Sequence, residues 1–564
     1  MEQQRLFLTI GLFFLLYLAY DAWQLEFGPK PAPVPYAQTT GETASSANVP
    51  MGADTPSNST VPQSLASSSI PSAATPVVAK AIKQAQRIKI ETDVLRIEID
   101  SQGGDIRVVD LLKYPETSKD DTKAFRLMSD ADENLFIAQS GFASKRNNND
   151  GTVIAAPNHN TIYKVEQTSY KLADGKDLIK VNLSWNSPDN VLFVKTYEFK
   201  RGSYQINVSH NIINKSAKTW RGNLYQQLQR KDYEDVNQSS FIYTYTGGVI
   251  YSPEEKYQKI DFSDMTDEDL KQDIKNGWAA IIQHYFLAAW VPPVDSTQSY
   301  YTRDLNQSRY AIGMNATNEV QVSPGSNTAL NNTLYIGPKL QDALEKIAPG
   351  LELTVDYGVL TFIAKPIFWL LNKIHNFVGN WGWAIILLTM LIKLVFYKLS
   401  EASYKSMANM RKVQPRLVAL KERFGDDRQK MNQAMMKMYK EEKINPLGGC
   451  LPILVQIPVF ISLYWVLLES VELRQADWIL WFTDLSAKDP YFVLPLLMGI
   501  TMFIQQKLNP PPLDPMQAKI MSALPIVFTI FFAFFPSGLV LYWVVNNTLS
   551  IAQQWYITRI VIKA

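Results

Sequence analysis

Hydrophobic residues follow three different patterns along this chain of 564 residues. Leu6 to Tyr20 is almost unbroken apolar sequence, residues from about 87 to 345 alternate between apolar and polar, and the sequence beyond residue 380 contains five further apolar stretches. Alternation with a period of two predicts half-buried strands, and long apolar stretches predict membrane-spanning helices. The pattern therefore predicts a multi-pass α-helical membrane protein that carries a large β domain.

Six membrane spans are expected in total. After the first stretch, the candidates are Trp381–Tyr397, Leu451–Leu468, Tyr491–Leu508, Ala518–Phe535 and Gly538–Ile557. Several are shorter than the roughly 20 residues that a typical bilayer requires, and Pro495 and Pro525 are expected to interrupt two of them. Short spans thin the surrounding lipid, although a transporter or channel can also contain short, broken helices.

The charges of the connecting loops predict the orientation. The segment from Lys398 to Lys443 carries twelve Lys or Arg residues against six Asp or Glu, whereas Glu469 to Asp489 carries two against five. Basic loops stay in the cytoplasm. Both termini are therefore expected inside and residues 24–380 outside.

The same patterns divide the chain into five parts. No convincing signal-peptide cleavage site follows the first apolar stretch, so it is expected to stay as an anchor. The expected parts are an anchor helix at 1–23, a disordered tether rich in Pro, Ser and Ala at 24–84, a β domain at 85–350, an amphipathic interfacial helix at 351–380, and a helical core at 381–564 with a cytoplasmic hairpin at 400–443.

Strict alternation in Leu95–Asp100 and Ile179–Trp185 predicts strands, and Phe193–Phe199 with Tyr204–Ile212 flank a hairpin signal at Arg201-Gly202-Ser203. One large antiparallel β-sandwich is expected, with helix only near its end. It contains no paired carboxylates or nucleophile motif, so we do not expect an enzyme. Such sandwiches often bind carbohydrate or peptide.

The composition argues against several kinds of binding site. The net charge of +2 gives no argument for DNA binding. The single cysteine, Cys450, excludes an intramolecular disulfide, and the four histidines do not lie at ligand spacing. We expect no metal site and no cofactor.

Lys393 is the most informative single residue, because it lies inside the apolar stretch that begins at Trp381. A charge at the centre of a membrane helix costs about 2.5–3.5 kcal/mol on insertion scales, so a functional role is the default interpretation. The alternative is that Lys393 extends its stem toward the interface near Lys398.

Several motifs together resemble the bacterial YidC branch of the YidC/Oxa/Alb membrane-protein insertases. They are Gly277-Trp278, Gln283-His284-Tyr285-Phe286, Tyr335-Ile336-Gly337-Pro338-Lys339, Asn445-Pro446-Leu447-Gly448-Gly449-Cys450-Leu451-Pro452, Ser470-Val471-Glu472-Leu473-Arg474, Asp489-Pro490-Tyr491 and Phe535-Pro536-Ser537-Gly538-Leu539.

The resemblance implies a five-helix insertase core, preceded by an anchor and by the periplasmic β domain typical of Gram-negative forms. The implied location is the inner membrane of a Gram-negative bacterium. It also implies a chaperone that inserts and folds inner-membrane proteins without a cofactor, alone or beside the Sec translocon. Lys393 stands where relatives usually carry an arginine in a hydrophilic groove, and Lys398 stands where a proline is common. The tail ends at Ala564 without the longer basic extension of some relatives, so a contact of the tail with the ribosome is not supported.

The groove implied by the resemblance would contain polar residues from several spans. Thr389 precedes Lys393 by four residues and shares its helix face. The other groove candidates are Gln456, Asn546, Tyr542 and Trp543, and further polar residues are Ser462, Gln505, Gln506, Asn547 and Thr548. Such residues can instead join helices by hydrogen bonds, and Tyr542 and Trp543 can simply pack.

The hairpin at 400–443 contains six of the sixteen methionines. Its binding candidates are Met407, Met410, Met431, Met435 and Met438. Methionine adapts its shape and is common on surfaces that bind many partners, but two helices must also bury residues against each other. The basic faces suit lipid headgroups or the ribosome.

Two other function classes remain open. A secondary transporter would use Lys393 as a proton or ion site, but we find no internal repeat of the kind that transporters contain. An envelope-binding protein would use the β domain and leave Lys393 unexplained. The sequence does not specify the client proteins, the dependence on Sec or the oligomeric state.

Overall fold

The computed structural model describes residues 85–117, 120–146, 151, 153–232, 244–424, 427–442, 451–509 and 515–561. The expected anchor at 1–23, the tether at 24–84 and Cys450 lie outside these residues. Within the described ranges the chain forms two compact units. One contains the described residues from 409 to 442, and the other contains the described residues from 85 to 408 and from 451 to 561.

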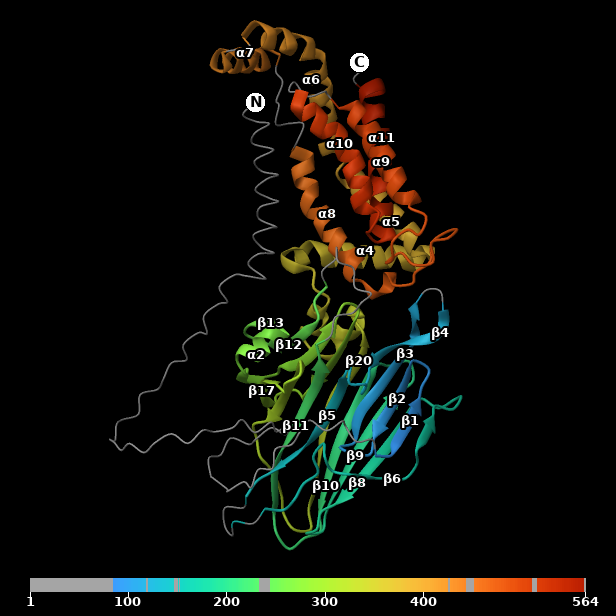
Figure 1. Cartoon of the computed structure of the whole chain (residues 1–564), viewed down its shortest axis with the longest axis vertical. Helices are drawn as coiled ribbons and strands as arrows, with labels where there is room; N and C mark the ends of the chain where they lie inside the picture. Colours follow the sequence, from blue (N-terminus) through green and yellow to red (C-terminus); the bar gives the residue numbers. More distant parts are fainter. Residues whose placement is uncertain are drawn as a thin grey trace, which may run out of the picture. The chain divides into compact units, whose positions relative to one another are not determined.

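Two large β-sheets make up the first part of the described chain (Figure 1). The eleven strands of the first sheet are β1 (Arg87–Glu91), β2 (Leu95–Asp100), β3 (Asp105–Thr117), β4 (Asp120–Met128), β5 (Phe136–Ser144), β7 (Ser169–Lys171), β11 (Trp220–Lys231), β14 (Lys271–Lys275), β17 (Thr297–Asp304), β18 (Arg309–Ala316) and β19 (Val320–Val322). Their order is β14-β17-β18-β11-β5-β3-β2-β1-β7, with β19 paired to β11 and β4 to β3.

The second sheet has nine strands in the order β13-β12-β15-β16-β20-β10-β9-β8-β6. Their bounds are β6 (Lys164–Val165), β8 (Leu178–Asn186), β9 (Val191–Lys200), β10 (Gln205–Asn214), β12 (Gly247–Ser252), β13 (Lys256–Ile260), β15 (Trp278–Gln283), β16 (Phe286–Val291) and β20 (Asn327–Pro338).

The strands predicted from alternation are confirmed. The segment Leu95–Asp100 is β2, and Ile179–Trp185 lies within β8. Strands β9 and β10 form the expected antiparallel hairpin, in which Gly202 has a φ of 67°. Among the described strand pairs only β1 and β7 are parallel. One expectation is wrong: helix is not confined to the end of the domain, because α2 (Phe262–Asp267) lies between β13 and β14.

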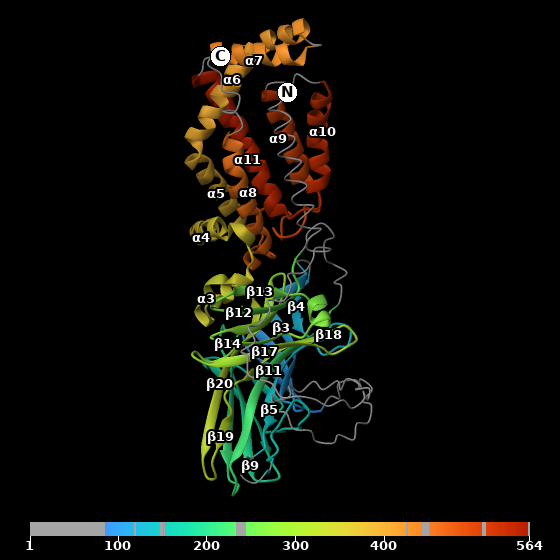
Figure 2. The same ribbon diagram turned by 90° about the vertical axis from the view of Figure 1, so that its left-hand side faces the viewer.

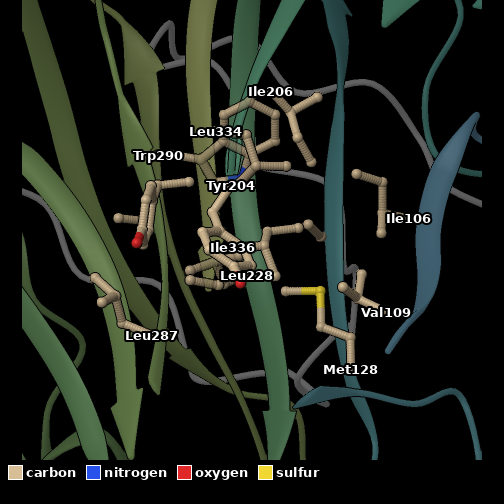
Figure 3. Packing of buried hydrophobic residues seen from close by; sticks show 14 of the residues in the cluster. Ile106, Val109, Met128, Tyr204, Ile206, Leu228, Leu287, Trp290, Leu334 and Ile336 are labelled. Atoms are coloured by element: carbon tan, nitrogen blue, oxygen red, sulfur yellow. The ribbon is translucent and has the colours of Figure 1, made fainter. Parts of the chain in front are cut away.

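The hydrophobic core lies between the two sheets and takes side chains from both (Figure 3). Ile106 and Leu228 come from β3 and β11 of the first sheet, while Leu287 and Ile336 come from β16 and β20 of the second. All four are fully buried. Each such side chain contributes roughly 1.5–3 kcal/mol to folding through the removal of apolar surface from water.

Short helical segments follow the β domain. They are α3 (Gln341–Ile347), the 3₁₀ turns η1 (Leu351–Thr354) and η2 (Gly358–Leu360), and α4 (Thr361–Val378). Helix α4 buries Ile367 and Leu371 on one side and exposes Phe362, Trp369 and Phe377 on the other. Within the range 351–380, the helix itself covers only Thr361–Val378 and follows the two 3₁₀ turns. The assignment of this range to an interfacial helix at the membrane surface stays a prediction.

The C-terminal region is helical (Figure 2). Helix α5 (Trp381–Val395) starts at Asn380, whose side chain accepts a hydrogen bond from the backbone N–H of Trp383. The other helices are α6 (Tyr397–Phe424), α7 (Arg428–Glu441), α8 (Leu451–Glu469), the turn η4 (Val471–Leu473), α9 (Val493–Leu508), α10 (Pro515–Phe532), α11 (Ser537–Tyr556) and a π-helical turn η5 (Ile557–Val561).

The prolines do not interrupt these helices, which corrects the expectation for Pro495 and Pro525. Pro495 lies in the first turn of α9, where the missing N–H has no helical acceptor to lose. Pro525 lies inside α10, and the helix continues through it.

Length and hydropathy give limited support for individual spans. Among the described helices, none is both long and apolar enough to cross a membrane alone. Helices α5 and α6 pass that test only as a pair, with a bend of 67° between them. The number of spans therefore stays a prediction.

Candidate functional site

The ammonium group of Lys393 faces α11. Its Nζ donates a hydrogen bond of 2.7 Å to the hydroxyl of Ser550, which in turn donates a bond of 2.7 Å to the backbone carbonyl of Asn546 one turn earlier. Lys393 is half-buried, and among the described residues it has no ion-pair partner. The side chain is therefore held by a neutral hydroxyl and keeps the capacity to donate to other groups, because an ammonium carries three N–H donors.

Thr389 lies one turn before Lys393 on α5 and is buried. Its hydroxyl donates a bond of 2.7 Å to the carbonyl of Ile385 in the same helix. This local bond satisfies the hydroxyl, so Thr389 adds a polar group next to Lys393, and no described hydrogen bond joins it to α11. We call Lys393, Thr389, Asn546 and Ser550 the Lys393 cluster.

Ser550 is the residue that sequence reasoning missed. It follows Asn546 by four residues and therefore extends the polar stripe of α11 by one helical turn. The same stripe continues to Gln554, whose Nε2 donates to the carbonyl of Leu508 at 3.2 Å. The i, i+4 spacing was the available signal, but a serine in a membrane segment carries little weight alone.

Tyr542 and Trp543 lie at a different contact. Both rings lie close to Phe460 of α8, with ring centroids 5.9 Å and 4.6 Å apart. Tyr542 is buried and Trp543 is half-buried. The three rings form a packed aromatic contact between α8 and α11. Tyr542 therefore fits a residue that packs between helices better than one that lines an open groove.

The other groove candidates are not all brought together. Gln456 is half-buried on α8, and no described hydrogen bond joins it to the Lys393 cluster. Asn547 is buried and faces α9, where its Nδ2 lies 3.5 Å from the hydroxyl of Thr501. Ser462 and Thr548 donate to carbonyls four residues earlier in their own helices.

The hairpin methionines divide into buried and partly exposed residues. Met431 and Met438 on α7 are buried, as are Val413 and Leu417 on α6. Met407, Met410 and Met435 are half-buried. The two helices are joined by an ion pair between Arg416 and Glu442, and α7 begins at Asp427, whose side chain accepts from the N–H of Lys430. Met431 and Met438 therefore fit a hairpin core, and the half-buried methionines remain candidates for partner contacts.

Two family-like motifs that lie far apart in sequence meet beside the helical region. Arg474 donates a bond of 2.8 Å to the carbonyl of Pro115, and its guanidinium lies over the rings of Phe125 and Phe286. Because Phe286 belongs to the motif Gln283–Phe286 and Arg474 to the motif Ser470–Arg474, the two motifs contact each other through these residues.

His284 and Lys339 also lie near this contact. Burial lowers the pKa of His284 to about 3, so the ring is neutral, and its Nε2 lies 3.0 Å from the carbonyl of Leu468. Burial also lowers the pKa of Lys339 to about 8, against the opposing attraction of Glu469. Within the described residues, no group of three or more His, Cys, Asp or Glu side chains is arranged to hold a metal ion.

Two family models match consecutive parts of the chain, and the boundary between them falls inside α4. The model of the YidC periplasmic domain matches residues 87–370, and the model described as 60Kd inner membrane protein matches residues 373–564. The chain thus combines a periplasmic β domain with an inner-membrane part.

Full-length relatives agree with both models. The membrane protein insertase YidC of Methylococcus capsulatus is 52% identical over 96% of this chain and 95% of its own length. That of Thioalkalivibrio sulfidiphilus is 50% identical over 100% of this chain and 99% of its own. A crystal structure of an active YidC insertase with its first transmembrane domain resolved is 18% identical, with a TM-score of 0.38, over 84% of this chain and 93% of that chain. The chain belongs to the YidC family of membrane protein insertases.

Proposed function

We propose that this protein inserts and folds proteins of the inner membrane and that the Lys393 cluster is where it receives a polar segment of the client. The observation that carries the proposal is the position of Lys393, which lies against α11 with a single described acceptor, the hydroxyl of Ser550. A charge inside an otherwise apolar helix is expensive to retain, and such charges are generally functional.

The chemistry follows from desolvation. A polar backbone or carboxylate loses its hydration when it enters the bilayer, at a cost of several kcal/mol if nothing replaces the water. The ammonium of Lys393 and the hydroxyl and amide groups near it supply replacement partners. Lys393 also attracts acidic residues of the client, whose outward movement is favoured by the membrane potential by about 2.3 kcal/mol per negative charge and 100 mV. No nucleotide is required by this scheme.

The wider assembly belongs to the same proposal. The basic segment at 400–443 lies in the cytoplasm and receives the nascent chain, with Met407, Met410 and Met435 as adaptable contacts. Helix α4 lies on the periplasmic surface of the membrane and uses the exposed Phe362, Trp369 and Phe377 as lipid contacts. We propose that the protein works alone for short clients and beside the Sec translocon for larger ones, and that the ribosome touches the hairpin.

The decisive experiment uses purified protein in lipid vesicles and two single-span clients that differ only in the charge of the translocated tail. We expect Lys393→Arg to insert both clients, because charge and reach are kept. Lys393→Ala and Lys393→Glu should impair the acidic-tailed client by about tenfold or more, which corresponds to ~1.4 kcal/mol, and the neutral-tailed client less.

The matched control is Lys398→Ala, about one turn further along the chain. Lys398 is highly exposed and pairs with Glu401, so its loss should leave both clients unaffected. Equal insertion of both clients by Lys393→Ala and the unchanged protein contradicts the proposal and favours a lysine that only reaches the interface. Inactivity of Lys393→Arg indicates that the lysine must release its proton, as in a transporter.

A further inference from the structure

The segment that joins α8 to α9 carries a short apolar tip, residues 478–482, that the proposed insertion mechanism does not use. Its sequence is Trp-Ile-Leu-Trp-Phe, and its only side-chain hydrogen-bonding groups are the two indole N–H groups. Leu480 is 81% exposed and Ile479 is 37% exposed, so the centre of the tip is turned away from the protein interior. A single exposed leucine is ordinary. The backbone and the contacts of this one set it apart.

The backbone holds Leu480 in a conformation that bulky residues avoid. Among the described non-glycine residues with a positive φ, only Leu480 and Phe492 carry apolar side chains, and both have a φ of 56°. The left-handed region is unfavourable for bulky side chains and is ordinarily occupied by glycine, asparagine or aspartate. Phe492, near the other end of the same segment, is 47% exposed. Such strain persists only where the surrounding structure imposes it, and it clusters at binding and active sites.

Hydrogen bonds close the tip into a fixed turn. The backbone N–H of Trp478 donates to the carbonyl of Phe482 at 2.9 Å, and the N–H of Phe482 donates to the carbonyl of Ile479 at 3.1 Å. The side chain of Asn380, which precedes α5, donates through Nδ2 to the carbonyl of Asp477 at 3.1 Å. The turn therefore keeps Leu480 outside and prevents it from folding back onto the helices.

The two tryptophans of the tip attach it to both neighbouring helices. Trp478 packs on Gly382 in the first turn of α5, where an added Cβ would overlap the indole ring. Trp481 donates from Nε1 to the carboxylate of Asp489 at 3.1 Å, and Asp489 accepts at 2.8 Å from the backbone N–H of Leu494 in α9. The tip is therefore a rigid projection held between the beginnings of α5 and α9.

The apolar surface of the tip continues along those helices. Both helices expose apolar side chains, which are Leu387, Leu391 and Leu394 on α5 and Leu496, Ile500 and Phe503 on α9. This part of the chain matches a family of inner membrane proteins, and exposed apolar surface of this kind meets lipid. The ring of Trp383 at the start of α5 lies 6.0 Å from that of Trp478, and tryptophan concentrates where acyl chains meet water. These positions favour the membrane interface as the surroundings of the tip.

The β domain indicates which side of the membrane the tip faces. Arg474, just before the tip, donates to the carbonyl of Pro115 in the β domain, which matches the model of a periplasmic domain. The tip therefore faces the periplasmic leaflet. Residues 475–487 include no Lys or Arg, so no electrostatic attraction to anionic headgroups is expected. Apolar area alone has to drive the contact with lipid.

We propose that the apolar tip inserts into the periplasmic leaflet of the membrane, with Ile479 and Leu480 among the upper acyl chains and the two tryptophans at the level of the headgroups. Apolar faces that lie in this interface reach roughly 5–10 Å into the boundary between headgroups and acyl chains. Because the turn is already rigid, insertion does not have to order a flexible loop. The inserted tip fixes the depth of α5 and α9 in the lipid, and it is independent of the Lys393 cluster.

The test measures lipid contact directly. Full-length protein with Cys450→Ser and Leu480→Cys is labelled at the introduced thiol with the fluorophore NBD and reconstituted alone in phosphatidylcholine vesicles. Lipids brominated in the upper acyl chain should quench about half of the fluorescence, because the label lies within the depth of an interfacial segment. The matched control is a label at Val294→Cys, an apolar position of the β domain that is 84% exposed and should stay unquenched. Val294 follows β16 at the end opposite Phe286, which places it about 17 Å or more from the Arg474 contact.

The quenchers also identify other occupants of the tip. Equal quenching at the two labelled sites contradicts the proposal, as does quenching at Leu480→Cys by aqueous iodide but not by brominated lipid. Protection from both quenchers means that protein, such as a second copy of this chain, covers the tip, which also overturns the proposal. Replacement of part of the phosphatidylcholine by anionic phosphatidylglycerol should leave the quenching unchanged, and a strong increase contradicts insertion by apolar area alone.

A second pair of variants tests the tip without a label on Leu480. With the label at Ile479→Cys, Leu480→Asn should lose most of the quenching by brominated lipid, since asparagine accepts a positive φ but is polar. The matched control Leu480→Met keeps an apolar side chain of similar volume and should retain the quenching. Near-UV circular dichroism checks that both variants are folded. Unchanged quenching in folded Leu480→Asn overturns the proposal.

Discussion

Two lysines, Lys195 of the β domain and Lys393 of the helical region, have different surroundings. Lys195 in β9 is 1% exposed, and its Nζ donates to the carbonyls of Gly103 and Ser140 at 3.0 and 3.1 Å. Lys393 in α5 is half-buried and donates to one hydroxyl, that of Ser550. The sandwich surrounds its lysine with fixed acceptors, and the helical region leaves its lysine only partly satisfied.

Charged and titratable groups also surround Lys195 in the β domain. Burial lowers the pKa of Lys195 to about 8, although the nearby carboxylate of Asp105 opposes this shift. His210, which is fully buried beside Ser140, has its pKa held well below the ordinary value by burial and by Lys195. The β domain uses its lysine to satisfy backbone groups in a closed core, whereas the lysine of the helical region has donors left for another molecule. Buried charge alone does not indicate function, and the number of internal acceptors distinguishes the two cases.

The largest effect is expected when the helical region loses its cytoplasmic hairpin. Deletion of residues 405–440 should abolish insertion while the remaining helices still enter the membrane, because the receiving surface is removed. Vesicle insertion assays measure the first effect, and protease accessibility measures the second. As a control, Met435→Leu should insert clients almost normally, since volume and apolarity are kept. Normal insertion by the deletion variant contradicts the receiving role of the hairpin.

Exchange of the two lysines for alanine should separate stability from activity. Lys195→Ala leaves two buried carbonyls without a donor and creates a cavity, so we expect the free energy of unfolding of the β domain to fall by about 3 kcal/mol. The ratio of acidic-tailed to neutral-tailed insertion should not change. Lys393→Ala should change this ratio and leave the free energy of unfolding of the β domain unchanged. Denaturant unfolding followed by near-UV circular dichroism, with the two-client assay, distinguishes the outcomes. If Lys195→Ala changes the ratio of acidic-tailed to neutral-tailed insertion, the proposed difference between the two lysines is wrong.

The pKa of Lys195 predicts how stability depends on pH. The folded-state pKa of about 8 lies below the unfolded value of 10.5, so above pH 8 the unfolded chain binds more protons than the folded chain. The cost of burying the charge is therefore complete below pH 8 and is relieved as pH rises. Between pH 8 and 9.5 the wild-type protein should gain roughly 2 kcal/mol relative to Lys195→Met. The difference in unfolding free energy between the two proteins measures this, and a constant difference contradicts it.

The smallest effect on insertion is expected from loss of the β domain. Deletion of residues 28–340 removes the partners of Arg474 at Pro115, Phe125 and Phe286 but leaves the Lys393 cluster and the hairpin intact. A stably expressed deletion variant should keep most of its insertion activity and support growth. The matched control extends the deletion through Val359–Phe377, which should abolish function because the helix that contacts the core is lost. If cells that carry only the shorter deletion do not grow, the β domain has an essential role and the prediction is wrong.

The sequence by itself determined the local elements and the family. Alternation located β2, β8 and the β9–β10 hairpin, because a strand buried on one face must repeat every two residues. It also determined that Lys393 lies in an apolar helix, because a charge within an apolar stretch is visible without any tertiary contact. The motifs around Phe286 and Arg474 identified the family without explaining why those residues are needed.

Tertiary structure alone decided which distant residues meet. Ser550 accepts from Lys393 across 157 positions of the chain, and no local pattern specifies that pairing. Likewise, Tyr542 of α11 packs on Phe460 of α8, which lies far from it in the sequence. Local sequence determines periodicity and propensity, because neighbours along the chain share one helix or strand. Contacts between elements depend on how whole helices and sheets pack, and the Lys393 cluster arises from such contacts.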